Sequence, residues 1–165
     1  MLTTDHQDRH RQRVYLAAPL FSEAERTFNI CVAELLEELT EVYLPQRDGG
    51  LMSEMVATGV QSVIAARHVF RQDMDAIKQA DYVIAILDGR AIDEGVAFEL
   101  GVGFSQAKRC VGLQTDSRRL AVWGNNPMIT GSLETVFMSV DDLMEWAQSV
   151  PRSWRIGSRH TKTGS

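Results

Sequence analysis

Tyr82-Val83-Ile84-Ala85-Ile86-Leu87 is a continuous apolar run, typical of a strand that is buried on both faces of a parallel sheet. The loop Asp88-Gly89-Arg90 follows it, and then comes Asp93-Glu94-Gly95-Val96-Ala97-Phe98-Glu99-Leu100-Gly101-Val102-Gly103, a pattern that predicts a helix from Gly95. A strand that leads into a helix is the repeating unit of an α/β fold. Strand and helix patterns on both sides of this unit define the rest of the fold.

Four further strands are predicted by short apolar runs at residues 14–18, 41–45, 110–114 and 135–138. Helices are predicted at residues 22–39, where Ser22-Glu23-Ala24-Glu25 has the form of a capping box, at 95–106, at 140–150 after Ser139, and across 51–80 with a break near Gly59. Polar loops are expected at 46–50 and 116–126, the second ending in a turn at Asn126-Pro127-Met128. This order predicts an α/β fold with a single doubly wound, flavodoxin-like five-stranded parallel sheet flanked by helices.

The bulk composition fits one ordinary globular domain. The chain has 165 residues, of which 44% are hydrophobic and 24% charged, and we place the domain at 13–150 between flexible tails at 1–12 and 151–165. A net charge of −5 gives no electrostatic reason to bind nucleic acid or a membrane surface. Two cysteines are too few for a disulfide framework, and the N-terminus lacks the apolar core of a signal peptide. We therefore expect a cytoplasmic protein.

Glu99 is the most unusual residue of the opening stretch, because it places a carboxylate in an apolar, glycine-rich helix. Burying a charge is costly unless it is paired, and no Lys or Arg lies between Arg90 and Lys108. Gly95 and Gly103 share the helical face of Glu99 and are expected to leave room beside it for a ligand. The alternative is that Glu99 faces solvent, as most helical glutamates do.

Three other residues have both a functional and a structural interpretation. Asp93 also suits the N-cap of the helix, and Asp73 also suits a solvated helix face. Tyr15 suits a core position in the first strand, with its hydroxyl bonded to some neighbour. Doubly wound sheets bind ligands at the carboxyl ends of their strands, where the winding reverses. We expect the site at that edge, where the loops at 18–22 and 88–95 meet, with Glu99 as the neighbour of Tyr15.

Several segments together resemble the nucleoside 2-deoxyribosyltransferase family, over about residues 13–147. The most specific one is the Asp-x-Gly-x-x-x-Glu-[Leu/Ile/Val]-Gly pattern after a strand. The matching segments are Tyr15-Leu16-Ala17-Ala18-Pro19 with Phe21, Leu44-Pro45-Gln46-Arg47-Asp48, Asp73, Asp93-Glu94-Gly95-Val96-Ala97-Phe98-Glu99-Leu100-Gly101 and Asn126-Pro127-Met128.

The resemblance implies that the chain exchanges the base of a 2′-deoxynucleoside for a free nucleobase. Glu99 would then be the nucleophile that forms a covalent deoxyribosyl ester, with retention of configuration overall. Tyr15 would hydrogen-bond and orient Glu99, and Asp73 would protonate the leaving base. The family needs no metal and no organic cofactor, so none is expected here.

The resemblance also implies a set of substrate-binding residues. Asp93 and Asn126 would hold the sugar hydroxyls, notably at the 5′ end, and Gln46 or Asp48 would contact the base. Phe21 would be a further substrate-binding residue. Asn126 and Met128 are lent by a neighbouring subunit in the family, which implies a homo-oligomer, a dimer or larger, with shared active sites. The preference for purines or pyrimidines would depend on the shape of the 46–60 region.

Two other functions compete with base exchange. The first is an N-glycoside hydrolase of the same superfamily, acting on nucleosides or on deoxynucleoside 5′-monophosphates. Relatives that bind the monophosphates carry a serine at the position of Asp93, and a carboxylate there would repel a phosphate. The second is a non-catalytic nucleotide-sensing module on the same fold. The complete set of Tyr15, Asp73, Asp93, Glu99 and Asn126 argues against it.

Overall fold

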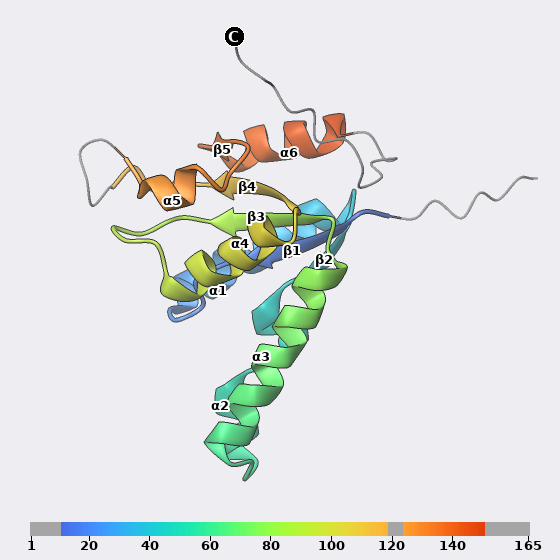
Figure 1. The fold of residues 1–165 in the computed structure, drawn as a ribbon, viewed down its shortest axis with the longest axis vertical. Coiled ribbons are helices and arrows are strands. Elements are labelled where there is room, and N and C mark those ends of the chain that lie inside the picture. The colour runs from blue at the N-terminus through green and yellow to red at the C-terminus, as the bar shows by residue number, and fades with distance from the viewer. Residues whose placement is uncertain (1–10, 119–123, 151–165) are drawn as a thin grey trace, which may run out of the picture.

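A five-stranded parallel sheet forms the centre of the computed structural model, which describes residues 11–118 and 124–150 (Figure 1). The strands run in the spatial order β2-β1-β3-β4-β5. Their bounds are β1 (Arg13–Ala17), β2 (Glu41–Tyr43), β3 (Tyr82–Ile86), β4 (Arg109–Leu113) and β5 (Val136–Phe137). This flavodoxin-like order confirms the predicted fold class, and the winding reverses between β1 and β3.

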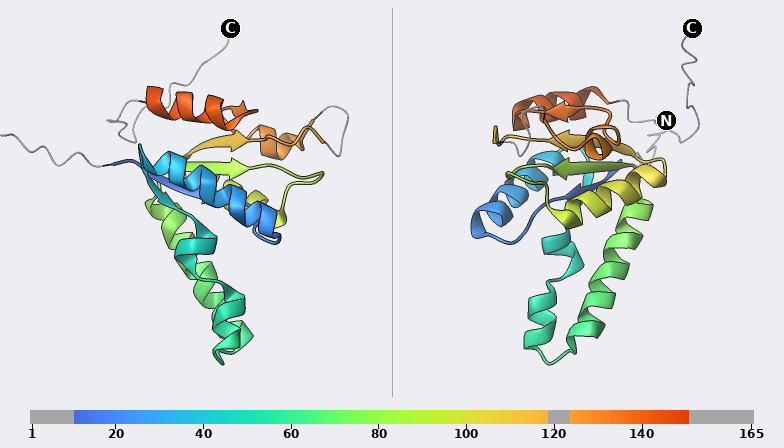
Figure 2. Two further views of the ribbon diagram at one scale, coloured as in Figure 1. Left: turned by 180° about the vertical axis from the view of Figure 1, so that it is seen from behind. Right: turned by 60° about the vertical axis from the view of Figure 1, so that its left-hand side comes forward.

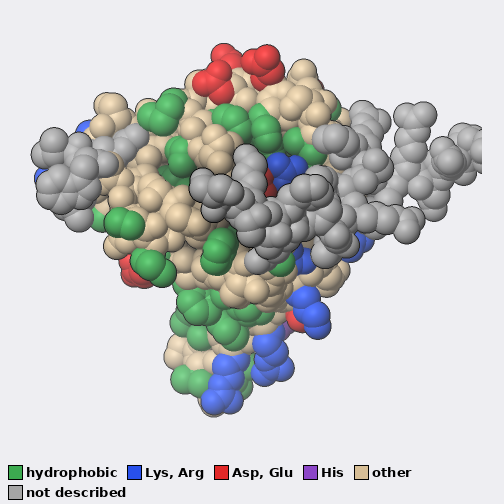
Figure 3. All heavy atoms as spheres, turned by 45° about the horizontal axis from the view of Figure 1, so that its top comes forward, with side chains coloured by type: hydrophobic (Ala, Val, Ile, Leu, Met, Phe, Trp, Pro, Cys, Tyr) green, Lys and Arg blue, Asp and Glu red, His purple; other side chains and the backbone are tan. Residues whose placement is uncertain are grey.

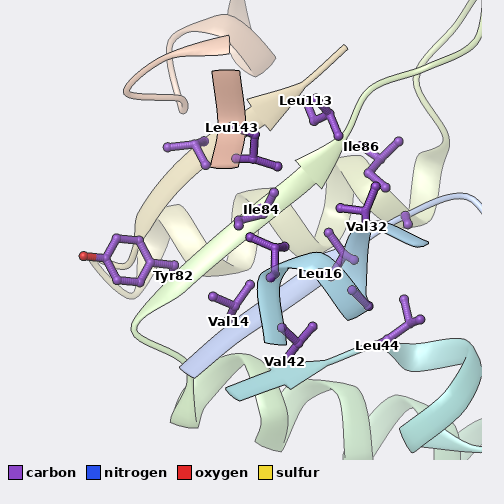
Figure 4. Packing of buried hydrophobic residues seen from close by; sticks show 14 residues of the cluster. Val14, Leu16, Val32, Val42, Leu44, Tyr82, Ile84, Ile86, Leu113 and Leu143 are labelled. Atoms are coloured by element: carbon purple, nitrogen blue, oxygen red, sulfur yellow. The ribbon is translucent and has the colours of Figure 1, made fainter. Parts of the chain in front are cut away.

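The two faces of the sheet pack against different helices, as a doubly wound fold requires. Side chains of alternate strand residues, such as Leu16 and Ile84, pack on α1 (Glu23–Glu37) and α6 (Val140–Ser149) through Leu36 and Leu143 (Figure 4). The opposite face carries Tyr15, Val83 and Cys110, which pack against α3 (Ser62–Gln79) and α4 (Glu94–Ser105). Tyr15 therefore belongs to the face that α3 and α4 cover.

The helix starts follow the capping signals of the sequence. Ser22 and Glu25 form the expected capping box of α1, in which the Glu25 amide donates to the Ser22 hydroxyl and the Ser22 amide donates to the Glu25 carboxylate. The expected break near Gly59 separates α2 (Met52–Ala57) from α3. Gly59 has a φ of 93°, a left-handed conformation that glycine adopts without strain.

Two segments differ from the sequence-based expectation. The polar loop expected at 46–50 is a single turn of π-helix, η1 (Pro45–Gly49), because the Asp48 carboxylate accepts a hydrogen bond from the Leu44 amide and closes the turn. Asn126-Pro127-Met128, expected as a turn, begins the short helix α5 (Pro127–Thr130). Proline suits the first helical position, which needs no amide donor.

Helices α2 and α3 form a hairpin that extends away from the sheet (Figures 1 and 2). No residue of α2 is buried, whereas Ala65 and Ile77 of α3 are. The C-terminal part of α3 lies beside the sheet and α4 (Figure 2). Asp73 lies on this part of α3, so it lies close to the face that carries Tyr15.

Some expectations fall on parts of the chain outside the described residues. These are the two tails, apart from residues 11 and 12, and residues 119–123 of the expected polar loop. Within 11–118 and 124–150, no helix is both long enough and apolar enough to cross a membrane.

Candidate active site

Tyr15 of β1 and Tyr43 of β2 form the floor of the site. They are direct register partners in the parallel pair β1–β2, so their side chains project from the same face of the sheet. Their rings stack with centroids 5.6 Å apart and an interplanar angle of 16°. Tyr15 is fully buried and Tyr43 partly so. Each hydroxyl reaches a different carboxylate on the helices above.

Glu99 is held by Tyr15, as expected. The Tyr15 hydroxyl donates a hydrogen bond of 2.7 Å to Oε1 of Glu99. On α4, Glu99 lies beside the buried residues Val96, Leu100 and Gly103, which share the side that faces the sheet. The carboxylate is therefore turned inward, and the alternative of a solvent-facing glutamate is wrong.

Gly103 has a different task from the one expected. A Cβ atom at this position would lie 2.5 Å from Cγ2 of Val83 on β3. The room left by the missing side chain of Gly103 is therefore taken up by the sheet and is not open to a ligand. Its missing side chain instead lets α4 approach the sheet closely. This approach brings Glu99, one turn earlier on the helix, within reach of Tyr15 on the neighbouring strand.

Burial dominates the electrostatics of Glu99. It raises the pKa of this carboxyl from an ordinary 4.5 to about 7, and the negative charges of Asp73 and Asp93 act in the same direction. The hydrogen bond from Tyr15 opposes the rise. Burial and the charge of Glu99 raise the pKa of the Tyr15 hydroxyl, so Tyr15 keeps its proton and remains a donor. Glu99 consequently changes between its charged and its protonated form near neutral pH.

Asp73 forms a second pair with Tyr43. The Tyr43 hydroxyl donates a hydrogen bond of 3.1 Å to Oδ1 of Asp73. Burial raises the pKa of Asp73, while the bond from Tyr43 lowers it. The interpretation of Asp73 as part of a solvated face is therefore wrong. Two carboxylates with raised pKa values in one site are a common arrangement for acid–base chemistry.

Asp93 caps α4 and also acts on Glu99. Its Oδ1 accepts a hydrogen bond of 3.0 Å from the Val96 amide, which confirms the N-cap interpretation. Its charge contributes to the raised pKa of Glu99, so the cap lies close enough to influence the carboxylate. Among the described residues, Oδ2 of Asp93 has no hydrogen-bond donor.

Gln46 and Asp48 hold η1 in place. The Gln46 side chain accepts a hydrogen bond from Nδ2 of Asn29 and donates one to the backbone carbonyl of Arg26. The Asp48 carboxylate accepts from the Leu44 amide and from Nε of Arg47. Asn29 is buried and also donates to the carbonyl of Pro19. Through these hydrogen bonds, the side chains of Gln46 and Asp48 hold η1 as a wall beside Tyr43.

Phe21, Asn126 and Met128 lie at the surface. The exposed fractions of Phe21 and Met128 are 76% and 81%. Asn126 is the N-cap of α5, where its Oδ1 accepts from the Met128 amide. The structure brings together Tyr15, Asp73, Asp93 and Glu99. The three outer residues instead form local hydrogen bonds, from the Phe21 amide to Glu25 and from the Met128 amide to Asn126.

The site extends from the strand edge, where it was expected, onto the face of the sheet between α3 and α4. Sequence reasoning missed Tyr43, Asn29 and Gly49, which all support the two carboxylates or the wall beside them. One signal for Tyr43 was present, since Val42-Tyr43 alternates like Val14-Tyr15. Without the register of β1 against β2, however, nothing in the sequence indicates that the two tyrosines are neighbours.

Comparison with known proteins gives one family and several solved structures. The family model of nucleoside 2-deoxyribosyltransferases matches residues 14–145. No curated protein sequence matches the chain significantly. A conserved protein from Enterococcus faecalis V583 is 26% identical in sequence, with a TM-score of 0.69, over 84% of this chain and 98% of the other.

Two further solved structures carry functional names. A 2-deoxyribosyltransferase from Bacillus psychrosaccharolyticus is 25% identical, with a TM-score of 0.67, over 80% of this chain and 90% of the other. A CMP N-glycosidase from Clostridium botulinum is 20% identical, with a TM-score of 0.50, over 83% and 99%. The second likeness concerns the fold alone.

Proposed function

Because the chain belongs to the nucleoside 2-deoxyribosyltransferase family, we propose that it exchanges the base of 2′-deoxynucleosides through a covalent ester on Glu99. The observation that carries this proposal is the hydrogen bond from Tyr15 to Glu99, 2.7 Å long, on a half-buried carboxylate beside a second carboxylate, Asp73. A carboxylate held in this way is both oriented and available for attack.

The reaction proceeds in two displacements at the anomeric carbon C1′. Glu99 attacks C1′ while the bond from C1′ to the base nitrogen breaks, and Asp73 gives its proton to the departing base. The incoming base then attacks C1′ from the side that the first base left, and the ester bond to Glu99 breaks. Asp73 takes up the proton that the incoming base loses. Two inversions give retention.

The raised pKa values suit these tasks. Glu99 has to be ionised to attack, and Tyr15 limits the rise of its pKa. Asp73 has to hold a proton when the base departs, and burial raises the pKa of Asp73 in that direction. A deoxy sugar also fits, because it lacks the electron-withdrawing 2′-hydroxyl that disfavours positive charge at C1′.

Base exchange is tested by incubating the protein with deoxyinosine and free adenine. The expected products are deoxyadenosine and hypoxanthine in equal amounts. Release of deoxyribose without deoxyadenosine would overturn the transferase proposal in favour of the hydrolase.

Asp93 and Asn126 bind the sugar hydroxyls in this proposal, with Oδ2 of Asp93 facing the substrate. A negative charge there repels a 5′-phosphate, so nucleosides are the expected substrates rather than nucleotides. Asp93→Ser keeps a side chain that caps α4 and removes the charge. We expect this variant to gain activity on deoxynucleoside 5′-monophosphates. Wild-type turnover of monophosphates as fast as that of nucleosides would contradict this assignment.

The base lies beside η1, whose wall Gln46 and Asp48 hold in shape, with Phe21 and Met128 as outer contacts. Their exposure is consistent with residues that a ligand or a second subunit covers. The preference for purines or pyrimidines follows from the shape of this wall, and a panel of donor and acceptor bases measures it.

A homo-oligomer with shared sites is also part of the proposal. Exposed large apolar side chains lie on α3 and α4, and the rings of Phe70 and Phe98 are 6.3 Å apart across the two helices. In Figure 3, hydrophobic side chains gather along one flank of the projecting hairpin, and Lys and Arg along the other. Such a patch is typical of a subunit interface.

Mixing two inactive variants, Glu99→Ala and Asn126→Ala, tests the shared site. If Asn126 of one subunit completes the site of its neighbour, mixed oligomers contain some sites with both wild-type residues, and activity returns. Mixing without any return of activity would show that each subunit uses its own Asn126.

A further inference from the structure

Tyr43 is a partly buried donor that does not bond to the nucleophile. Its hydroxyl bonds to Oδ1 of Asp73 at 3.1 Å, while Glu99 is bonded to Tyr15 alone of the two tyrosines. The β1–β2 register places Tyr43 directly beside Tyr15, and ring stacking at 16° holds it there. The position of the hydroxyl is therefore fixed by the sheet rather than by a flexible loop.

Gly49 closes the pair from a third side. A Cβ atom on Gly49 would lie 2.8 Å from the Tyr43 hydroxyl and 2.9 Å from Oδ1 of Asp73. The backbone of η1 consequently lies directly against the hydrogen bond between them. Because the Tyr15 ring also stacks on the Tyr43 ring, the pair has little freedom to move.

From this geometry we propose that Tyr43 is a positioning residue for Asp73: it occupies Oδ1, so that the proton delivered to the leaving base resides on Oδ2. The inference rests on the proposed base exchange. A protonated carboxyl carries its hydrogen on one oxygen, and the oxygen that already accepts from Tyr43 is the poorer place for it. Tyr43 keeps its own proton throughout, and Asp73 alone gives and regains one.

The same bond stabilises the product of proton transfer. When Oδ2 gives up its proton to the base nitrogen, Asp73 becomes an anion, and the bond from Tyr43 becomes charge-assisted and stronger. Within residues 11–118 and 124–150, the other ionisable groups that act on this pair are Glu99 on α4, Tyr15 on β1 and Asp48 on η1. No cation is among them, so the Tyr43 hydroxyl is the group that offsets the new charge.

The direction of the pKa change follows from this arrangement. Burial raises the pKa of Asp73, and the bond from Tyr43 lowers it. Tyr43→Phe removes the bond but keeps the ring and its stacking, so the pKa of Asp73 rises in the variant. Asp73 is then a weaker acid toward the departing base.

Leaving-base dependence in Tyr43→Phe tests the proposal. With ordinary deoxynucleosides, we expect kcat to fall by about tenfold, the worth of one charge-assisted hydrogen bond, while KM changes little. With donors whose electron-poor, nitro-substituted base leaves without a proton, we expect kcat to stay near that of the wild type. Asp73→Asn should show the same selectivity, and adding Tyr43→Phe to it should cost little more.

A matched control separates positioning from a general effect on the fold. Tyr82→Phe removes a hydroxyl on the opposite face of the sheet, where Tyr82 packs on Trp146, and should leave both donor classes unaffected. An independent readout is the pKa of Asp73, followed by carboxyl-carbon NMR titration. It should be higher in Tyr43→Phe than in the wild type, whether or not turnover is measured.

The outcomes are distinct. An equal loss of kcat with both donor classes, or an unchanged pKa of Asp73, would overturn the positioning role of Tyr43. A wild-type protein that exchanges no bases with either donor class would instead overturn the proposed function. In that case the NMR titration still reports on the bond between Tyr43 and Asp73.

Discussion

The two tyrosine–carboxylate pairs use the same chemical groups at different depths in the molecule. Tyr15 lies fully buried in β1, between two other strands, and holds Glu99 at 2.7 Å. Tyr43 lies partly buried in the edge strand β2 and holds Asp73 at 3.1 Å. The pKa of both carboxyls is raised by burial, that of Glu99 to about 7.

This difference suggests how two similar pairs come to have different tasks. The deeper carboxylate is oriented by a buried tyrosine and suits direct bond formation with carbon. In the proposal, the base departs beside the outer carboxylate, which therefore suits proton transfer. In the proposed mechanism, position in the sheet rather than residue type separates the nucleophile from the acid.

Removal of the deeper carboxylate should have the largest effect. We expect Glu99→Ala and Glu99→Gln to lower kcat/KM by at least about 10³-fold with every donor, because no other group forms the ester. Steady-state exchange assays measure this loss. Turnover near that of the wild type in either variant would rule out Glu99 as the nucleophile.

Thermal unfolding provides the matching control for the fold. Because the pKa of Glu99 is raised in the folded state to about 7 from 4.5, the unfolding free energy falls as pH rises through this window. Glu99→Gln carries no such charge. We therefore expect the variant to have a higher Tm than the wild type at about pH 8 and the advantage to vanish near pH 4.

Removal of the outer carboxylate should have a large but selective effect. We expect Asp73→Asn to lower kcat by about 10²–10⁴-fold with ordinary bases, the usual contribution of a general acid. With nitro-substituted bases, the loss should be small. The charge of Asp73 also raises the pKa of Glu99, so the pH at which such donors react half-maximally should decrease. A uniform loss with all donors would remove the distinction between the two pairs.

Loss of the Tyr15 hydroxyl should have the smallest effect of the three. Tyr15→Phe removes a hydrogen bond that lowers the pKa of Glu99, so this pKa should rise above about 7. With donors that need no proton, the rate follows the ionisation of Glu99 alone, and its midpoint should move to higher pH. Tyr43→Phe should leave that midpoint in place. A shift of the midpoint in Tyr43→Phe, with none in Tyr15→Phe, would show that the proposed pairing of tyrosines with carboxylates is wrong.

Much of the fold was predictable, because it depends on patterns that are local in the sequence. Five apolar runs, with helices between the first four, predicted a doubly wound parallel sheet, and Ser22 with Glu25 predicted the start of α1. The turn of π-helix at Pro45–Gly49 was not predictable, because it depends on where the Asp48 side chain finds a donor. Helix α5 is too short to show a periodic pattern.

The candidate site was predictable where a residue is unusual for its place in the sequence. Glu99 stood out as a charge within an apolar helix, and the structure places Tyr15 beside it. Tyr43 was missed because its partnership with Tyr15 depends on strand register, which no local pattern encodes. Gly103 was misread for a related reason, since the identity of Val83 as its neighbour depends on how α4 docks on β3.

The central claim, a covalent deoxyribosyl ester on Glu99, is tested most directly by intact-protein mass spectrometry. A 2′-fluorinated donor with a nitro-substituted base should form the ester quickly and release it slowly, because the fluorine disfavours the positively charged transition state of the second step. We predict a mass increase of one fluorodeoxyribosyl group, located by peptide mapping at Glu99 and absent in Glu99→Gln. Base release without any adduct, or an adduct that persists in Glu99→Gln, would contradict the account.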